Sequence, residues 1–300
     1  MVKNHPDTVT MNEQKNLRRL YLLRKSGLFH RIPTEIRCKQ ATNVAEYRSA
    51  YQLVYQSYLE KAYILPNTAQ MRIRPWETSP TTGTFICKKS GEVIGVTSTI
   101  MDSEDLGLPS DIAFHPELSG MRDEGAILCE ISNQAIATAF RNSAVVTELM
   151  QAAYGHAWFM EASDLVCAVS PKQRKFFELI GFEQVGETKS YSDVIFDPVI
   201  LLRLRDIQTR YADTASESRE LNTFWNNFFI MLNPYIPIYP LWQRMVNSLF
   251  SSDAQLSGLF EGCTDVFANA DHRAQAAVKR NLGSVYTKMM TAENTTAQTN

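Results

Sequence analysis

Alternating and uninterrupted runs of apolar residues predict a set of β-strands in the first two thirds of the chain. The expected strands lie at residues 35–40, 84–88, 93–100, 126–135, 164–169, 182–188 and 192–204. The second and third of them flank a short turn that contains Gly91, which is a β-hairpin signal. The run 164–169 is apolar almost without interruption, as is typical of a strand buried on both faces.

Apolar residues at helical spacing predict helices between several of these strands. Asn43 followed three residues later by Glu46 is a capping signature, and it opens a stretch with helical periodicity. A long amphipathic helix is expected at residues 143–160. A shorter helix begins near Pro171 and ends at Gly181, because glycine readily adopts the left-handed conformation found at helix ends.

The order of these elements predicts the α+β class, with a mixed sheet and flanking helices rather than a doubly wound parallel sheet. Neither glycine-rich phosphate-binding pattern, GxGxxG or GxxxxGKS/T, occurs in the sequence. After about residue 206, aromatic pairs alternate with short polar pieces, which favours a helical extension whose tail beyond Thr291 is disordered. We therefore divide the chain into a basic N-terminal arm (1–34), a central domain (35–206) and a helical C-terminal extension (207–300).

Composition narrows the functional classes. A formal net charge of -2 gives no overall attraction for nucleic acid. The five cysteines are widely spaced without a CxxC pair, so we expect buried free thiols rather than disulfides or a zinc site. The histidines show no metal-ligand spacing, and we expect neither a metal nor a permanently bound cofactor. Because no apolar run is long enough to span a bilayer, the expected location is cytoplasmic, with peripheral membrane contact through the basic stretch 15–31 left open.

A group of motifs carries a family resemblance that covers roughly residues 35–206. The motifs are Asp102-Ser-Glu-Asp-Leu-Gly-Leu-Pro109, Glu117-Leu118, Met121-Arg122, Cys129-Glu-Ile-Ser132 and the segment Phe176 to Phe182, with Tyr55 and Ala62 to Ile64. Together they resemble the N-acyl amino acid synthase family and its relatives, the acyl-homoserine lactone synthases. The resemblance implies a GNAT-like mixed sheet that is splayed at its centre, and an N-acyltransferase that moves a fatty acyl chain from an acyl carrier protein thioester to the amine of an amino acid or a similar small amine.

The resemblance and the strand periodicity together suggest site residues. Glu130 and Ser132 alternate onto one face of their strand, and we expect Glu130 to accept the amine proton with Ser132 as a polar partner. By position, Arg122 and Lys172 are candidate cations for an acceptor carboxylate. The remaining candidates are Phe176 and Phe177 for substrate binding, Arg174 and Lys175 for an acidic carrier protein, and Leu165, Val166 and Phe182 as further walls of an acyl tunnel.

The sequence departs from its relatives at Asn133, at Lys172-Gln173 and at Phe177, where those proteins carry charged or reactive groups. Residues 137–144 contain no glycine to cradle a pyrophosphate, which favours a carrier protein over coenzyme A as the donor. Three alternatives stay open: an acyl-coenzyme A-dependent GNAT acetyltransferase, an acyl-homoserine lactone synthase that uses S-adenosylmethionine, and a non-catalytic module that binds acyl chains or carrier protein.

Overall fold

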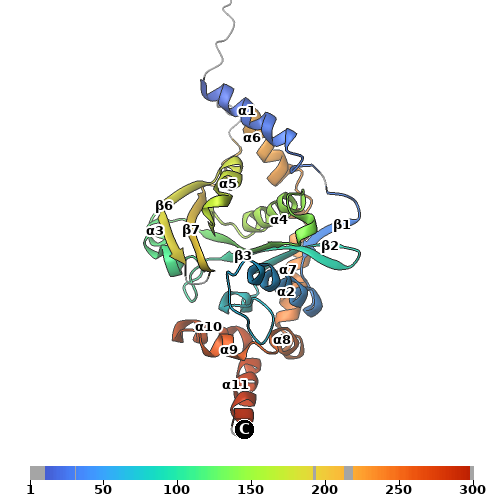
Figure 1. Ribbon diagram of the computed structural model, residues 1–300, viewed down its shortest axis with the longest axis vertical. Helices are drawn as coiled ribbons and strands as arrows, with labels where there is room; N and C mark the ends of the chain where they lie inside the picture. The colour runs from blue at the N-terminus through green and yellow to red at the C-terminus, as the bar shows by residue number, and fades with distance from the viewer. Residues whose placement is uncertain (1–10, 31, 192–193, 213–218, 298–300) are drawn as a thin grey trace, which may run out of the picture.

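One seven-stranded sheet forms the centre of the protein, with the strand order β1-β2-β3-β4-β5-β7-β6. The computed structural model describes residues 11–30, 32–191, 194–212 and 219–297. The strands are β1 (Ile36–Gln40), β2 (Gly83–Lys89), β3 (Glu92–Met101), β4 (Leu128–Ile136), β5 (Asp164–Val169), β6 (Glu183–Tyr191) and β7 (Val194–Leu204). β4 and β5 pair in parallel, and the other neighbouring strands pair antiparallel. The predicted α+β class with a mixed sheet is confirmed (Figure 1).

The helices of the central domain flank this sheet, and those of the two ends extend above and below it (Figure 1). The α-helices are α1 (Met11–Lys25), α2 (Val44–Glu60), α3 (Asp111–Asp123), α4 (Val145–Phe159), α5 (Arg174–Ile180), α6 (Arg219–Asn226), α7 (Tyr239–Phe250), α8 (Asp253–Phe260), α9 (Thr264–Ala268), α10 (His272–Leu282) and α11 (Ser284–Ala297). Short 3-10 turns are η1 (Pro75–Thr78), η2 (Thr138–Phe140), η3 (Pro171–Gln173) and η5 (Ile236–Ile238), and η4 (Asn227–Met231) is a π turn. Among the described residues, no helix is long and apolar enough to cross a membrane.

Local sequence signals account for the helices that were predicted. The Asn43 side chain accepts a hydrogen bond from the backbone N–H of Glu46 at 3.0 Å and so begins α2. Gly181 ends α5 with a φ of 112°. The sequence did not predict α3, because Pro116 lies inside it and interrupts the helical signal. At the C-terminus, α11 continues past Thr291 to Ala297, where disorder was expected.

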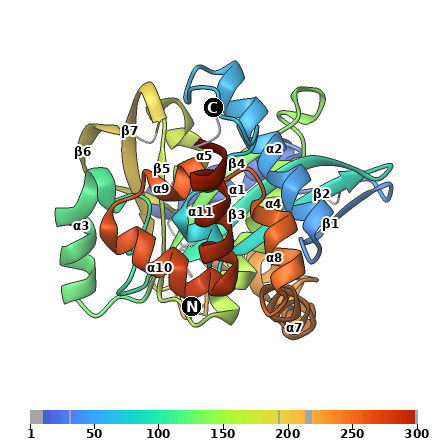
Figure 2. The same ribbon diagram turned by 90° about the horizontal axis from the view of Figure 1, so that it is seen from below.

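The two faces of the sheet bury different sets of side chains. Cys129 and Ile131 of β4 belong to a cluster with α4 and α5, which α1 and α6 extend. Leu128, one position out of phase, lies on the opposite face and packs against α3. A third cluster joins α2 to the helices α7 to α11, of which α8 to α11 lie in front of the sheet in the view from below (Figure 2). The terminal segments therefore share their cores with the central domain.

The centre of the sheet is splayed between β4 and β5, as the family resemblance implied. The two strands pair only over Leu128–Glu130 and Asp164–Val166. Beyond this point β4 continues to Ile136 beside β3, while β5 continues beside β7. On its β3 side, β4 carries a bulge, because Val96 pairs with Ala135 and Ser98 with Ser132. One extra residue in β4 is thus accommodated at Asn133, which has a φ of 49°.

The register of the first two strands corrects the expectation of free cysteines. Cys38 of β1 lies directly opposite Cys87 of β2, and the two form a disulfide with a Cα–Cα distance of 4.1 Å. Cys129, Cys167 and Cys263 are free and buried, as predicted. The sequence alone does not predict this pair, because the two cysteines are 49 residues apart and only the strand pairing brings them together.

A buried histidine links the sheet to the C-terminal helices. His156 of α4 is 1% exposed, and its Nδ1 lies 2.8 Å from Thr99 Oγ1 of β3. The rings of Phe85 and Tyr239 pack at centroid distances of 5.4 and 5.7 Å. Burial disfavours the imidazolium ion and lowers the pKa of His156 to about 4. The protein therefore folds around a neutral imidazole.

This histidine predicts acid sensitivity. As pH falls below about 6.5, the unfolded chain binds a proton that the folded protein rejects until about pH 4, so the free energy of unfolding decreases across this window. At about 1.4 kcal/mol per tenfold difference in proton affinity, the loss is roughly 3 kcal/mol. Urea unfolding between pH 7 and 4 should show this loss in the wild type and a smaller one in His156→Gln. Equal pH slopes in both proteins would contradict it.

Candidate active site

A cavity of about 230 Å³ opens where β4 and β5 diverge. Its walls come from the end of α2, the segment 61–74, the second half of β4, the end of β5, η3 and Phe177 of α5. The polar and charged lining includes Glu130, Ser132, Arg72, Arg74 and Lys172. The splay of the sheet therefore exposes the polar face of β4 to a space large enough for a small substrate.

Glu130 is held at the closed end of the splay. It is 2% exposed and belongs to the last residue pair, with Val166, before the strands part. Its Oε2 accepts a hydrogen bond from the backbone N–H of Ser110 at 2.9 Å, just before α3 begins. The amino end of a helix favours negative charge. The carboxylate is thus both buried and oriented.

A buried ion pair fixes Ser132 and the bulge of β4. Arg74 and Glu77 lie 2.8 Å apart, with side chains 6% and 0% exposed. Arg74 Nη2 also donates to Ser132 Oγ at 3.2 Å, and Asn133 Nδ2 donates to Glu77 Oε1 at 2.9 Å. The segment that carries Arg74 and Glu77 is therefore hydrogen-bonded to β4 at two consecutive residues, Ser132 and Asn133.

A second cavity of about 390 Å³ adjoins the first. It is lined by the start of α4, Leu28, Ser57 and Phe176, and it shares five residues with the first cavity. The shared residues are Lys61, Gln134, Lys172, Gln173 and Phe177. The two spaces therefore meet beside the bulge of β4, so that ligands in them would lie end to end.

The sequence candidates on α5 fall into two groups. Phe177 lines both cavities and Phe176 lines the second. Arg174 and Lys175 are exposed and line neither cavity, and Arg174 Nε donates to Glu178 Oε1 at 2.6 Å. The basic side chains of α5 thus lie on the surface, while its two phenylalanine rings line the cavities.

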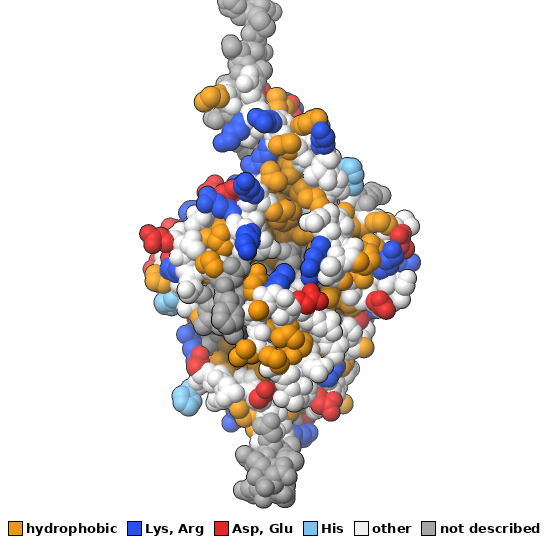
Figure 3. Space-filling view, in the orientation of Figure 1, with side chains coloured by type: hydrophobic (Ala, Val, Ile, Leu, Met, Phe, Trp, Pro, Cys, Tyr) orange, Lys and Arg blue, Asp and Glu red, His pale blue; other side chains and the backbone are white. Residues whose placement is uncertain are grey.

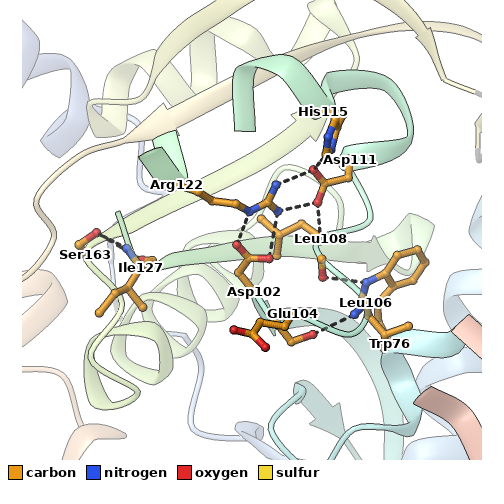
Figure 4. Close-up of polar contacts among 12 residues, drawn as sticks. Trp76, Asp102, Glu104, Leu106, Leu108, Asp111, His115, Arg122, Ile127 and Ser163 are labelled. Atoms are coloured by element: carbon orange, nitrogen blue, oxygen red, sulfur yellow. Dashed lines mark hydrogen bonds and ion pairs between the residues drawn. The ribbon is translucent and has the colours of Figure 1, made fainter. Parts of the chain in front are cut away.

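Arg122 lines neither cavity, and its guanidinium lies between Asp102 and Asp111 (Figure 4). Its guanidinium donates to Asp102 at 2.6 Å and to Asp111 at 2.6 Å. Burial opposes ionisation of Asp111, but hydrogen bonds from Arg122 and from the Leu108 backbone outweigh it and hold the pKa of Asp111 below its ordinary value. Arg122 therefore joins the two ends of the loop before α3, and we do not propose it as a substrate ligand.

The other tunnel candidates are packed into the core. Leu165, Val166 and Phe182 are at most 2% exposed and line neither cavity. Sequence reasoning missed Arg72, Arg74 and Glu77. The alternation Met71-Arg-Ile-Arg74 is the signal that could have found them, since alternate residues of an extended segment point to opposite sides.

These features fit transfer of an acyl group to an amine. The site combines a buried carboxylate that can take a proton, a bulge that sets Asn133 and Gln134 opposite the single residue Thr97 of β3, and cationic side chains in the lining. Among the residues that the structure describes, no three His, Cys, Asp or Glu side chains are grouped to hold a metal ion. A buried carboxylate at the splay of a mixed sheet is therefore the centre of the candidate site.

Comparison with known families identifies the family. The profile of the family described as N-acyl amino acid synthase FeeM matches residues 49–205, which is more than half of the chain. The chain therefore belongs to the N-acyl amino acid synthase FeeM family, and it is an N-acyltransferase. A search of the curated proteins finds no match.

Several solved structures are similar to part of this chain. The structure of FeeM, an N-acyl amino acid synthase from uncultured soil microbes, is similar to this one with a TM-score of 0.51 and 24% identity, over 57% of this chain and 89% of that one. The acyl-homoserine lactone synthase LasI gives 0.44 and 15%, over 58% and 92%. An N-acetyltransferase from Staphylococcus aureus Mu50 gives 0.43 and 15%, over 57% and 99%.

Proposed function

We propose that this protein transfers a fatty acyl chain from the phosphopantetheine thioester of an acyl carrier protein to the amine of an amino acid or a similar small amine. The observation that carries the proposal is that the first cavity, which Glu130 lines, meets the second cavity beside the bulge of β4. The thioester arm occupies the second cavity, and the acceptor amine occupies the first.

The chemical step needs a neutral amine and a stabilised oxyanion. The neutral amine nitrogen attacks the thioester carbonyl carbon, and Glu130 takes the proton that this nitrogen must then lose, directly or through water. Backbone N–H groups at Asn133 and Gln134 stabilise the negative charge that develops on the carbonyl oxygen. The C–S bond then breaks, and the pantetheine thiolate leaves beside the Lys172 ammonium, from which it takes a proton.

Buried positive charge in the first cavity favours an acceptor that carries a carboxylate. Arg72 is 8% exposed and stacks on the ring of Tyr58 at 4.9 Å. Lys61 and Lys172 add further cations to the lining of this cavity. An amino acid presents both the amine that Glu130 requires and the carboxylate that these side chains attract.

Two observations favour a carrier protein as the donor. The segment 137–144, which forms η2 and the turn before α4, contains no glycine that would let a pyrophosphate approach the backbone. Lys172, Arg174 and Lys175 are exposed on η3 and the start of α5, and Figure 3 shows Lys and Arg side chains gathered around the middle of this face. An acidic carrier protein is the partner that such a surface attracts.

The direct test incubates the purified protein with dodecanoyl-carrier protein, dodecanoyl-coenzyme A or acetyl-coenzyme A. Each donor is combined with a panel of amino acids, with amines that lack a carboxylate and with S-adenosylmethionine. We expect N-acyl amino acids by mass spectrometry, with the carrier protein as the better donor. Product only from acetyl-coenzyme A, or only in the presence of S-adenosylmethionine, would replace the proposal by one of the alternative acyltransfer reactions.

Charge reversal on α5 tests the donor surface separately. Arg174→Glu combined with Lys175→Glu should raise the KM for acyl-carrier protein by about tenfold, since rim charges mainly affect encounter with a charged partner. The KM for acyl-coenzyme A should stay within a factor of about two. The matched control is Arg244→Glu with Lys279→Glu, an equal change of charge at exposed positions of α7 and α10. An equal rise of KM in the control would show that net charge, and not this surface, is responsible.

A further inference from the structure

The C-terminal helices lie outside the region that matches the family. They nevertheless pack against a segment that lines the first cavity. Met71 and Ile73 are 0% and 4% exposed, and they pack into the cluster that contains Phe260, Phe267 and Leu282. The alternate residues of the same extended segment, Arg72 and Arg74, line the cavity. The C-terminal helices therefore bury one side of the segment whose other side binds substrate in the proposed function.

Helix α10 also holds the turn that follows this segment. Asn281 Nδ2 donates to Thr78 Oγ1 at 3.1 Å, and the Thr78 hydroxyl donates to the carbonyl oxygen of Pro75 at 2.7 Å. Thr78 is 0% exposed and directly follows Glu77, which binds both Arg74 and Asn133. Two adjacent residues of η1 thus connect the two elements, since Thr78 is bonded to α10 and Glu77 to the bulge of β4.

Helix α10 also contacts the 102–110 loop, which precedes α3. Arg280 forms an ion pair with Asp105 at 2.6 Å, and Arg273 donates to the carbonyl oxygen of Glu104. The indole Nε1 of Trp76 in η1 donates to the carbonyl oxygen of Gly107 at 3.0 Å and ties the turn to this loop. The loop leads to Ser110, whose N–H binds Glu130.

We propose that α10 is a positioning element of the acceptor side of the active site. Through η1 it orders Arg74, Glu77 and the bulge, and through the 102–110 loop it orders the backbone donor that orients Glu130. The second cavity, on the α4 side, has no wall from α7 to α11 among the described residues. Loosening α10 therefore weakens acceptor binding and leaves donor binding intact, an inference that rests on the proposed assignment of acceptor and donor to the two cavities.

The test uses Asn281→Asp in the full chain, an isosteric change that removes the donor to Thr78. Hydrogen–deuterium exchange should accelerate in peptides covering 71–78 and 102–110 by about tenfold, the order expected from one lost hydrogen bond, and stay unchanged in 141–146. The KM for the acceptor should rise by about five- to tenfold, while the KM for the donor stays within about twofold.

Thr78→Val, which removes the hydroxyl from the other partner, should reproduce this pattern, and Thr78→Ser should restore wild-type behaviour. Lys279→Ala, an exposed position on the same helix, is the control that should change neither readout. A lower melting temperature with equal changes in both KM values, or no change in exchange at 71–78, would overturn the proposal. If the wild type transfers acyl chains to no amine, the exchange experiment still decides the positioning role, and the missing turnover counts against the proposed function alone.

Discussion

Glu130→Gln should lower kcat/KM for acyl transfer by about 10²- to 10⁴-fold, the range typical of losing a positioned general base. The amide oxygen can still accept the hydrogen bond from the Ser110 N–H, so the strand and α3 should keep their places. What the variant loses is the ability to take a proton from the amine. Steady-state rates of N-acyl product formation by mass spectrometry, with the melting temperature measured in parallel, check the prediction.

Two companion variants sharpen this experiment. Ser132→Ala should have a smaller effect, since Ser132 is bound by Arg74 and serves as a polar partner rather than as the base. Glu124→Gln, which alters a carboxylate 58% exposed on the surface, should leave the rate unchanged. Activity of Glu130→Gln within about threefold of wild type would remove Glu130 from the role of general base, because a base contributes at least about a hundredfold.

Arg74→Met should lower the free energy of unfolding by about 3–5 kcal/mol, because it leaves the Glu77 carboxylate buried without the cation that compensates it. The side chains of this pair are 6% and 0% exposed, so the Glu77 carboxylate has little contact with solvent. Urea unfolding at pH 7, followed by circular dichroism, gives the free energy directly.

The matched comparison is an ion pair on the surface. Arg174→Met breaks a pair with Glu178 whose side chains are 50% and 40% exposed, and it should cost at most about 1 kcal/mol. Combining Arg74→Met with Glu77→Gln should recover part of the lost stability, since the uncompensated charge is then gone. Equal losses from the buried and the exposed pair would contradict the assigned role of burial.

The sequence by itself determined the elements whose signals are local. Period-two alternation and short apolar runs depend only on neighbouring residues, so they located the strands and placed Glu130 and Ser132 on one face. The left-handed turn at Gly181 likewise follows from the residue at that position. Local conformational preference needs no partner from elsewhere in the chain, which explains why these predictions agree with the structure.

The tertiary structure alone decided which distant residues meet. Strand pairing joined Cys38 to Cys87, and the packing of the C-terminal helices turned Arg72 and Arg74 toward the splay of the sheet. It also tied Arg122 to Asp102 and Asp111 instead of placing it in a cavity. Such contacts depend on register, on shared burial and on how two strands diverge, and these are properties of the assembled sheet that no local stretch of sequence contains.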